Sequence, residues 1–201
     1  METPHKLAIY DFDGTLIHGD SFIMFARKAA GRRFYIALLR ALPHILAWKA
    51  GLISGGVAKE KLFSYLFRGM PRSEWLKKCD DFADSIDRSV RRTTAETLER
   101  DRSDGFMPVI LTASPADWVR PWAHRAGIEC VIGTEVETDS AGLLTGRFAT
   151  PNCHGKEKVN RLLQTFSRAA DCTTRAYGDS PSDKYILDFA DEGHMIDKSK
   201  P

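Results

Sequence analysis

The stretch IYDFDGTL, residues 9–16, decides the fold class that the sequence predicts. The apolar run from Leu7 to Tyr10 has the length and composition of a short buried strand. Asp11 and Asp13 follow it, and because alternate side chains of an extended segment share a face, the two carboxylates are expected to point the same way. Such carboxylates repel each other unless a cation lies nearby, and Mg²⁺ suits a site with one or two of them. An Asp-rich turn without a function is the alternative for these two residues taken alone.

Length, composition and charge set wide bounds. With 201 residues and 43% apolar content, the chain can bury one core and carry an inserted subdomain. The net charge of +2 gives no reason to expect a nucleic-acid partner. The cysteines are scattered without a C-x-x-C pair, which disfavours a zinc site and a disulfide framework and fits a reducing cytoplasm. Residues 1–5 lead into a strand rather than an apolar signal region, so a cytoplasmic protein is expected.

Residues 21–104 are predicted to be wholly helical. Apolar spacing indicates a helix ended by Gly31, a second from Arg33 to Lys49 that is interrupted or kinked near Pro43, and a third over residues 58–67. A long helix is expected to run from residue 73 through residue 101. A helical block that follows the first strand of an α/β chain predicts a cap over residues 21–104, with the core formed by residues 1–20 and 105–201.

The segment from Phe34 to Trp48 is unusually apolar. A membrane span needs roughly 20 uninterrupted apolar residues, and Arg40, His44 and Lys49 interrupt this segment or end it, so a span is not expected. Two interpretations remain. The segment is either a buried cap helix or a surface that makes peripheral contact with a lipid membrane or an apolar substrate.

The α/β pattern returns with a buried strand over residues 106–111, which ends in the turn TASP, residues 112–115. Ser114 is expected to be the N-cap of the next helix, with Pro115 at its first position and Asp117 closing a capping box. A strand-to-helix turn favours a phosphate. Thr112 is not needed for the cap and is therefore the better phosphate-binding candidate.

Two further strand-to-helix turns carry charged residues. After a strand over residues 129–132 and a hairpin over 135–148, a helix begins near GKEK, residues 155–158, where Lys156 and Lys158 are both candidates for a phosphate ligand. The pattern C-x-G-x-x-K favours Lys158. A strand over residues 174–177 then runs into GDSPSD, residues 178–183. Asp183 there is either a helix-capping residue or a site residue, whereas Asp179 lies at the strand end before the cap.

The order DFDGTL, TASP, G-x-x-K and GDSPSD resembles the four motifs of the haloacid-dehalogenase-like (HAD) phosphohydrolases along nearly the whole chain. The helical insertion after the first motif looks like the cap of the phosphoserine-phosphatase-like subfamily IB. The resemblance implies an α/β fold with a Rossmann-like parallel sheet, whose strand ends converge on one crevice. It also implies an Mg²⁺-dependent phosphatase that acts through an aspartyl-phosphate.

The resemblance assigns roles to individual residues. Asp11 would be the nucleophile, Asp13 the general acid and base, and Thr112 with Lys158 or Lys156 would hold the phosphoryl oxygens. Mg²⁺ would be bound by Asp11, by the backbone carbonyl of Asp13 and by Asp179, with Asp183 supporting the ion through water. A HAD-fold phosphotransferase and a non-catalytic binding module are the alternatives from other functional classes.

The substrate is expected to be a small or amphipathic phosphomonoester. The resemblance suggests Asp20, Thr112, Ala113 and Arg68 as substrate-binding residues. Phosphoserine phosphatases carry a Glu after the first motif and an Arg on the cap, whereas this chain has Asp20 at the first place and Tyr65 at the second. This departure disfavours phosphoserine, and the apolar segment at residues 34–48 favours an amphipathic leaving group such as a glyceryl lipid.

Overall fold

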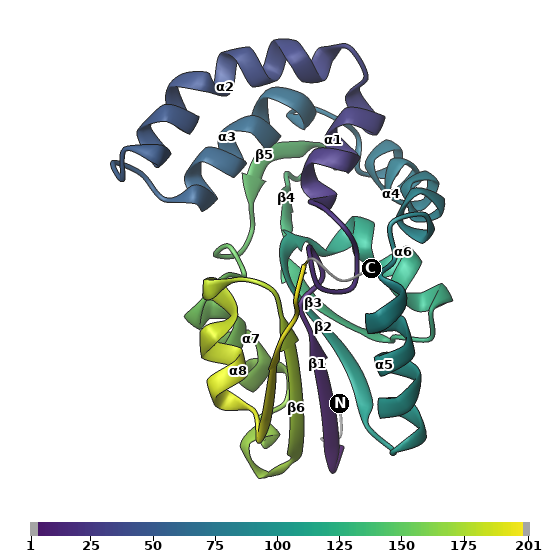
Figure 1. Ribbon diagram of the computed structural model, residues 1–201. Helices are drawn as coiled ribbons and strands as arrows, with labels where there is room; N and C mark the ends of the chain where they lie inside the picture. The colour runs from purple at the N-terminus through teal and green to yellow at the C-terminus, as the bar shows by residue number, and fades with distance from the viewer. Residues whose placement is uncertain (1–3, 199–201) are drawn as a thin grey trace.

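The computed structural model describes residues 4–198. Within that range a five-stranded parallel sheet forms the base of the molecule, in the order β3-β2-β1-β6-β7 (Figure 1). The strands are β1 (Lys6–Tyr10), β2 (Met107–Pro115), β3 (Cys130–Thr134), β6 (Thr173–Gly178) and β7 (Glu192–Met195). The predicted α/β class with a parallel sheet is therefore confirmed.

Helices cover both faces of this sheet, as a parallel sheet requires. Ala8 and Tyr10 of β1 pack in a core shared with α5 (Arg92–Ser103) and α6 (Ala116–Arg125). Leu7 and Ile9 point to the other face, where α7 (Lys156–Thr165) and α8 (Lys184–Phe189) pack. Short 3₁₀ turns lie at Ala169–Asp171 and Pro181–Asp183. The alternation along β1 thus divides the apolar residues between two layers.

A helical layer lies beyond the carboxyl ends of the strands (Figure 1). It contains α1 (Ser21–Ala30), α2 (Arg33–Lys49), α3 (Gly55–Phe67) and α4 (Arg72–Asp87). The hairpin of β4 (Val136–Thr138) and β5 (Leu144–Phe148) belongs to the same layer, because Gly69 N donates to Leu144 O at 2.8 Å and Leu144 N donates to Met70 O at 2.9 Å. We call α1–α4 and this hairpin the cap layer. A cap with the bounds 21–104 stays a prediction.

The prediction of a single helix over residues 73–101 is wrong, because two helices, α4 and α5, lie there, separated by residues 88–91. The break pairs with the segment after β1: His18 N donates to Ser89 O at 2.6 Å, and Arg91 N donates to Leu16 O at 2.9 Å. Beyond it, α5 lies beside the core sheet, where Asp101 accepts hydrogen bonds from Tyr10 and Arg175. Tertiary pairing therefore overrides the helical pattern.

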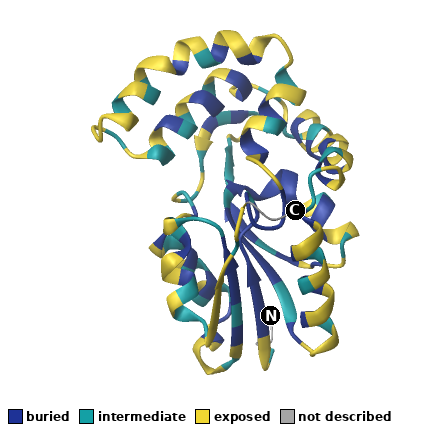
Figure 2. Cartoon of the chain, in the orientation of Figure 1, coloured by how far each residue is buried: buried dark blue, intermediate teal, exposed yellow. Residues whose placement is uncertain are grey.

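The helix α2 runs unbroken through Pro43. Only Phe34, Ala37 and Ala41 of this helix are fully buried, so the interpretation of the segment as a buried cap helix is wrong. In Figure 2 its outer side is largely exposed. None of the helices in residues 4–198 has the length and apolar content needed to cross a bilayer.

Candidate active site

The carboxyl ends of β1, β2 and β6 meet beneath the cap layer. Asp11 follows β1 directly, and its backbone N–H donates to Tyr177 O in β6 at 2.9 Å. Thr112 lies near the end of β2, and Asp179 follows β6. Such strand ends are where parallel α/β sheets place their ligands. Three of the four predicted motifs therefore share one edge of the sheet, and α7 adds the fourth.

Lys158 joins the first and last motifs. Its Nζ atom lies 2.6 Å from Asp11 Oδ1 and 2.6 Å from Asp183 Oδ1, and the residue is 2% exposed. Burial alone would lower the pKa of Lys158, but the two carboxylates hold that pKa above its ordinary value. Lys156 is exposed, with its ammonium 5.5 Å from the centre of the Tyr185 ring. Of the two candidate lysines, only Lys158 lies in the cluster.

Asp11 is buried in an environment that opposes its charge. Burial raises its pKa to about 7, Lys158 counteracts the shift, and the charge of Asp183 adds to it. Lys158 is shared between two carboxylates, so one ammonium does not neutralise the pair. An additional cation beside Asp11 would favour the ionised carboxylate that nucleophilic attack needs.

Asp183 caps the turn after β6 and also lies in the cluster with Lys158. It closes a capping box with Ser180, whose N–H and hydroxyl donate to Asp183 Oδ2 at 3.1 and 2.8 Å. Asp179 N donates to the same oxygen at 3.2 Å, while the other oxygen accepts from Lys158. The charged partner Lys158 and these bonds keep its pKa below the ordinary value despite burial. Asp183 therefore fixes both the turn after β6 and the position of Lys158.

Asp11, Asp179 and Asp183 each offer a carboxylate oxygen, and these three atoms lie within 4.8 Å of one another. Thr15 Oγ1 donates to Asp179 Oδ1 at 3.3 Å, and Lys198 pairs with the other oxygen of Asp179. Gly14 makes this approach possible: its φ is +82°, and a Cβ atom there would lie 2.3 Å from Asp179 Oδ2. An all-oxygen set fits Mg²⁺, which keeps several waters besides its protein ligands.

Asp13 lies on the other side of the site. Its Oδ1 accepts from Ser21 N at the start of α1, and its Oδ2 accepts from Ser114 Oγ, both at 2.6 Å. Burial raises the pKa of Asp13, the charge of Asp20 adds to this, and Lys59 and the two serines oppose it. Asp11 and Asp13, which the sequence expects to share a face, therefore have different hydrogen-bond partners. A carboxyl group with a raised pKa suits proton transfer.

Ser114 is not the helix N-cap that the sequence predicts, and its hydroxyl lies in the candidate site instead. Strand β2 continues through Pro115, and α6 begins at Ala116. The Ser114 hydroxyl is thereby free to donate to Asp13, and it also accepts from Ser21 Oγ at 3.0 Å. Thr112 is fully buried, and its Oγ1 accepts from Ser114 N at 3.0 Å. Thr112 thus shapes the turn that aims Ser114.

Asp117 does not close a capping box as expected. It accepts from Arg72 Nη2 at 2.8 Å and from Trp75 Nε1 at 2.7 Å. Both donors belong to α4, so Asp117 ties the cap layer to the core helix α6. The capping pattern was misleading because the same short acidic side chain serves a contact distant in sequence.

Lys59 is a second site residue that the sequence did not indicate. It lies on α3, and its Nζ donates to Ala113 O at 3.1 Å and lies 5.1 Å from the centre of the Phe22 ring. Burial lowers its pKa, and the charges of Asp13, Asp20 and Asp11 oppose that shift. The position of Lys59 depends on how the cap docks on the core, which no local pattern reveals.

A cavity of about 810 Å³ opens between α1, α2 and α3 beside this site. Its polar lining includes Asp20, Lys59 and His154, and Ala113 also borders it. Most of its lining is apolar and includes Phe22, Ile23, Leu38, Ile45, Trp48 and Leu62. Asp20 also caps α1, with Ile23 N donating to its Oδ1 at 3.1 Å. The predicted residues Asp20 and Ala113 therefore lie together at the mouth of the site.

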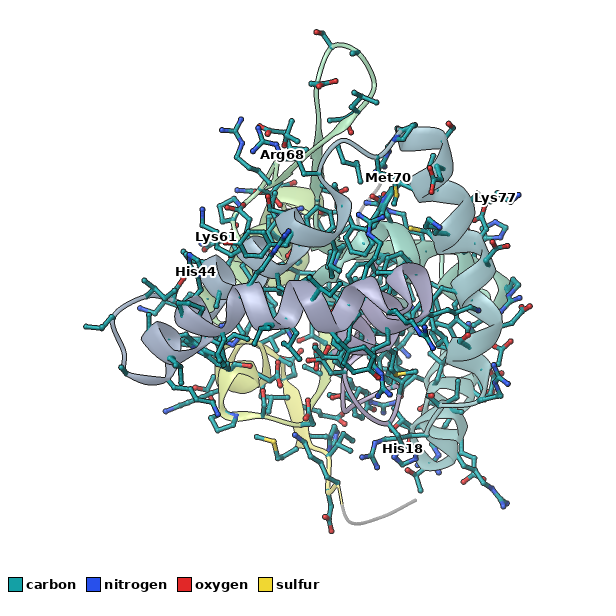
Figure 3. All side chains as sticks on the ribbon, turned by 90° about the horizontal axis from the view of Figure 1, so that it is seen from above. His18, His44, Lys61, Arg68, Met70 and Lys77 are labelled. Carbon is teal, nitrogen blue, oxygen red and sulfur yellow. The ribbon has the colours of Figure 1, made fainter. Side chains whose placement is uncertain are left out.

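Arg68 lies elsewhere. It lines a separate cavity of about 450 Å³ between α3 and the β4–β5 hairpin, together with Glu60 and Arg147. Seen from above in Figure 3, α2 crosses the molecule and Arg68 lies on the flank next to the hairpin. The expected role of Arg68 in gripping the substrate has no support from this position.

Comparison with known proteins agrees with this geometry. Residues 8–188 match the model of the haloacid dehalogenase-like hydrolase family, so the chain belongs to that family of hydrolases, and the predicted family is confirmed. Protein CicA of Caulobacter vibrioides is 34% identical over 197 residues, an alignment that spans 97% of this chain and 88% of the relative.

Solved structures of other proteins share the fold. A protein of unknown function from Bordetella pertussis Tohama I superposes with a TM-score of 0.76 at 22% identity, over 92% of this chain and 87% of that one. A phospho-aspartyl intermediate analogue of phosphoserine phosphatase gives 0.64 at 17% identity, over 93% of this chain and 84% of that one.

Proposed function

We propose that this protein is an Mg²⁺-dependent phosphomonoester hydrolase that forms an aspartyl-phosphate on Asp11. The observation that carries the proposal is the ammonium of Lys158, held 2.6 Å from Asp11 and from Asp183, with Asp179 in the same carboxylate cluster. This arrangement joins a nucleophile, a phosphate-neutralising cation and a metal-ligating oxygen set in one site.

In the first step, a carboxylate oxygen of Asp11 attacks phosphorus while the bond to the leaving oxygen breaks. Asp13 gives its proton to the leaving alkoxide, which its raised pKa favours. In the second step, Asp13 takes a proton from water, the water oxygen attacks phosphorus, and the bond to Asp11 breaks. Asp11 returns as a free carboxylate, and inorganic phosphate leaves.

The surrounding residues stabilise charge during both steps. Lys158 neutralises negative charge on the phosphoryl oxygens and on Asp11, while Asp183 keeps its ammonium in place. Ser114 and Ser21 orient the carboxyl group of Asp13. Mg²⁺, held by Asp11, the Asp13 carbonyl and Asp179, would supply further positive charge to the transferring group.

The proposed substrate is an amphipathic phosphomonoester. The adjoining cavity has mostly apolar walls, and Lys59 at its mouth offers an ammonium to a second anionic group. Each buried methylene contributes about 0.8 kcal/mol, so a few outweigh one charge-assisted contact of ~2 kcal/mol. The phosphoserine phosphatase in the comparison acts on phosphoserine by its name, whereas this cavity favours a longer apolar leaving group.

The test is a panel of phosphomonoesters with purified protein, in Mg²⁺ and in excess chelator. We expect release of phosphate only with Mg²⁺, and a higher kcat/KM for a short-chain phosphatidylglycerophosphate than for phosphoserine. Full activity in chelator would contradict the metal assignment. If kcat/KM for phosphoserine is about tenfold higher or more, the proposal of an amphipathic substrate is wrong. Such a ratio means that the site favours phosphoserine by ~1.4 kcal/mol.

A further inference from the structure

The outer face of α2 exposes a row of large apolar side chains. Tyr35, Ile36, Leu39, Leu42 and Leu46 are 59%, 57%, 71%, 44% and 57% exposed. We call these five side chains the α2 outer face. A protein surface seldom leaves so many neighbouring large apolar side chains in water without a binding role. None of the described residues covers this face.

The helical geometry separates this face cleanly from the side that packs on the protein. At 3.6 residues per turn, Tyr35, Leu39, Leu42 and Leu46 form one stripe, since they are three or four positions apart. The buried residues Phe34, Ala37 and Ala41 lie on the opposite side of the helix. Figures 1 and 2 show α2 as the outermost element of the cap layer, with its exposed side turned away from the core.

The charge around the α2 outer face is positive. Residues 20–68 contain nine lysines and arginines against two acidic residues, whereas the remainder of the chain has twenty against twenty-five. On the helix, Arg33 and Arg40 flank the apolar stripe on one side and Lys49 flanks it on the other, and all three are exposed. Long basic side chains at such edges can reach lipid phosphates while their stems lie along apolar surface.

These observations favour one occupant over another. A second copy of the chain on the same face would bring two positively charged rims together, which opposes association. An anionic lipid surface satisfies both parts of the pattern, because the apolar side chains enter the acyl boundary and the cations meet the headgroups. We propose that the α2 outer face docks this protein on the surface of an anionic phospholipid bilayer.

Docking would place the cavity beside the active site close to the lipid. The inner side of α2 contributes Leu38, Ile45 and Trp48 to that cavity, so one helix has its outer side at the membrane and its inner side at the site. The proposal does not depend on the phosphatase chemistry. A protein with no turnover at all would still bind vesicles if the α2 outer face acts as described.

The test is co-sedimentation of the full chain with vesicles of phosphatidylcholine alone and of phosphatidylcholine with phosphatidylserine. We expect binding to the anionic vesicles, little binding to the neutral ones, and release at high salt. The double variant Leu39→Glu with Leu46→Glu should bind at least about tenfold more weakly, because it places carboxylates in the apolar boundary. Leu76→Glu on α4 is the matched control, since Leu76 is 41% exposed on another helix and should bind as the wild type does.

Hydrolysis of a soluble aryl phosphate and thermal unfolding are measured on the same variants. Unchanged values would show that loss of vesicle binding does not come from loss of the fold or of the site. Equal binding to neutral and anionic vesicles, or undiminished binding of the double variant, would overturn the proposal. A third result would also overturn it: the wild type forms a dimer and does not bind vesicles, while the double variant is a monomer. The α2 outer face would then be an interface between two copies of the chain.

Discussion

Lys158 and Asp11 lie 147 positions apart in the sequence, and their charged atoms are 2.6 Å apart in a buried site. The same ammonium contacts Asp183 at 2.6 Å, 25 positions further along the chain. One lysine on α7 therefore connects the end of β1 to the turn after β6. Loss of Lys158 would leave two buried carboxylates without their shared cation, so this contact couples the stability of the fold to the geometry of the site.

Replacement of Lys158 by Met is expected to cost about 3–5 kcal/mol of folding free energy, because two buried carboxylates lose their shared cation. Activity should fall below detection, since the phosphoryl charge also loses its partner. Lys156→Met is the matched control: Lys156 is exposed and should change stability by less than about 0.5 kcal/mol. Chemical denaturation of both variants checks this prediction. Near-equal stabilities would contradict the role given to Lys158.

Asp13→Asn is expected to stabilise the metal-free protein at neutral pH. Burial raises the pKa of Asp13 above 3.8, its ordinary value. At a pH just above 3.8 the folded state therefore still holds the proton of Asp13, whereas the unfolded state has lost it. The wild type therefore loses stability as the pH rises above 3.8, and the Asn variant lacks this loss. The variant should unfold on the order of 2–4 °C higher, the shift that ~1 kcal/mol produces in a chain of this size.

The measurement for Asp13→Asn is thermal unfolding at a series of pH values in chelator. The difference between variant and wild type should be near zero at pH values below 3.8 and should grow as the pH rises above it. The opposite result is a variant that matches the wild type at acid pH but is less stable than the wild type at neutral pH. That result would show that the fold stabilises Asp13 as a carboxylate.

Ser114→Ala should move the pH profile of kcat. The hydroxyl of Ser114 donates to Asp13 at 2.6 Å and lowers the pKa of that carboxyl, so its removal raises the pKa further. The limb of the profile that titrates with Asp13 is expected to move to higher pH, and kcat should fall about tenfold or more. Ser103→Ala, which removes an exposed hydroxyl bonded to Glu99 O, is the control. A lower kcat with an unmoved profile would restrict Ser114 to a structural role.

Lys59→Met tests whether the cap takes part in substrate recognition. The ammonium of Lys59 lies at the mouth of the cavity, where it can pair with a second anionic group of the substrate. The value of kcat/KM should fall about ten- to a hundredfold for a phosphomonoester with such a group, and less for an aryl phosphate. Lys61→Met, an exposed lysine on the same helix, should leave both values unchanged. An equal loss on both substrates would place Lys59 in the chemistry rather than in selectivity.

Local patterns in the sequence were sufficient for the core and for most of the cluster. Strand β1 and the turn after it could be predicted because an apolar run, paired carboxylates and Gly14 all describe the same strand end. The capping role of Asp183 could also be predicted, since its box with Ser180 spans four consecutive residues and needs no distant partner. The order of the four motifs then predicted that Asp11, Lys158 and Asp179 lie close together.

The errors arise where distant contacts decide the structure. The helix expected over residues 73–101 breaks because residues 89–91 bond to the chain after β1. Ser114 resembles an N-cap, but β2 continues past it and its hydroxyl binds Asp13. Lys59 carries no signal in the sequence, because its position beside the site follows from the docking of α3 on the core. The sequence left the exposure of α2 open between a buried helix and a contact surface, because the packing of α2 on the rest of the cap depends on residues distant in sequence.

The central claim is that Asp11 carries the phosphoryl group during turnover. Trypsin cleavage after Lys6 and Arg27 releases a peptide of residues 7–27 that contains Asp11 and Asp13. Protein quenched during turnover should yield this peptide with one added phosphoryl group, and fragmentation should place the group on Asp11. Asp11→Asn, with an unchanged fold, should give neither the modified peptide nor product. A phosphoryl group on another residue, or wild-type turnover by Asp11→Asn, would contradict the account.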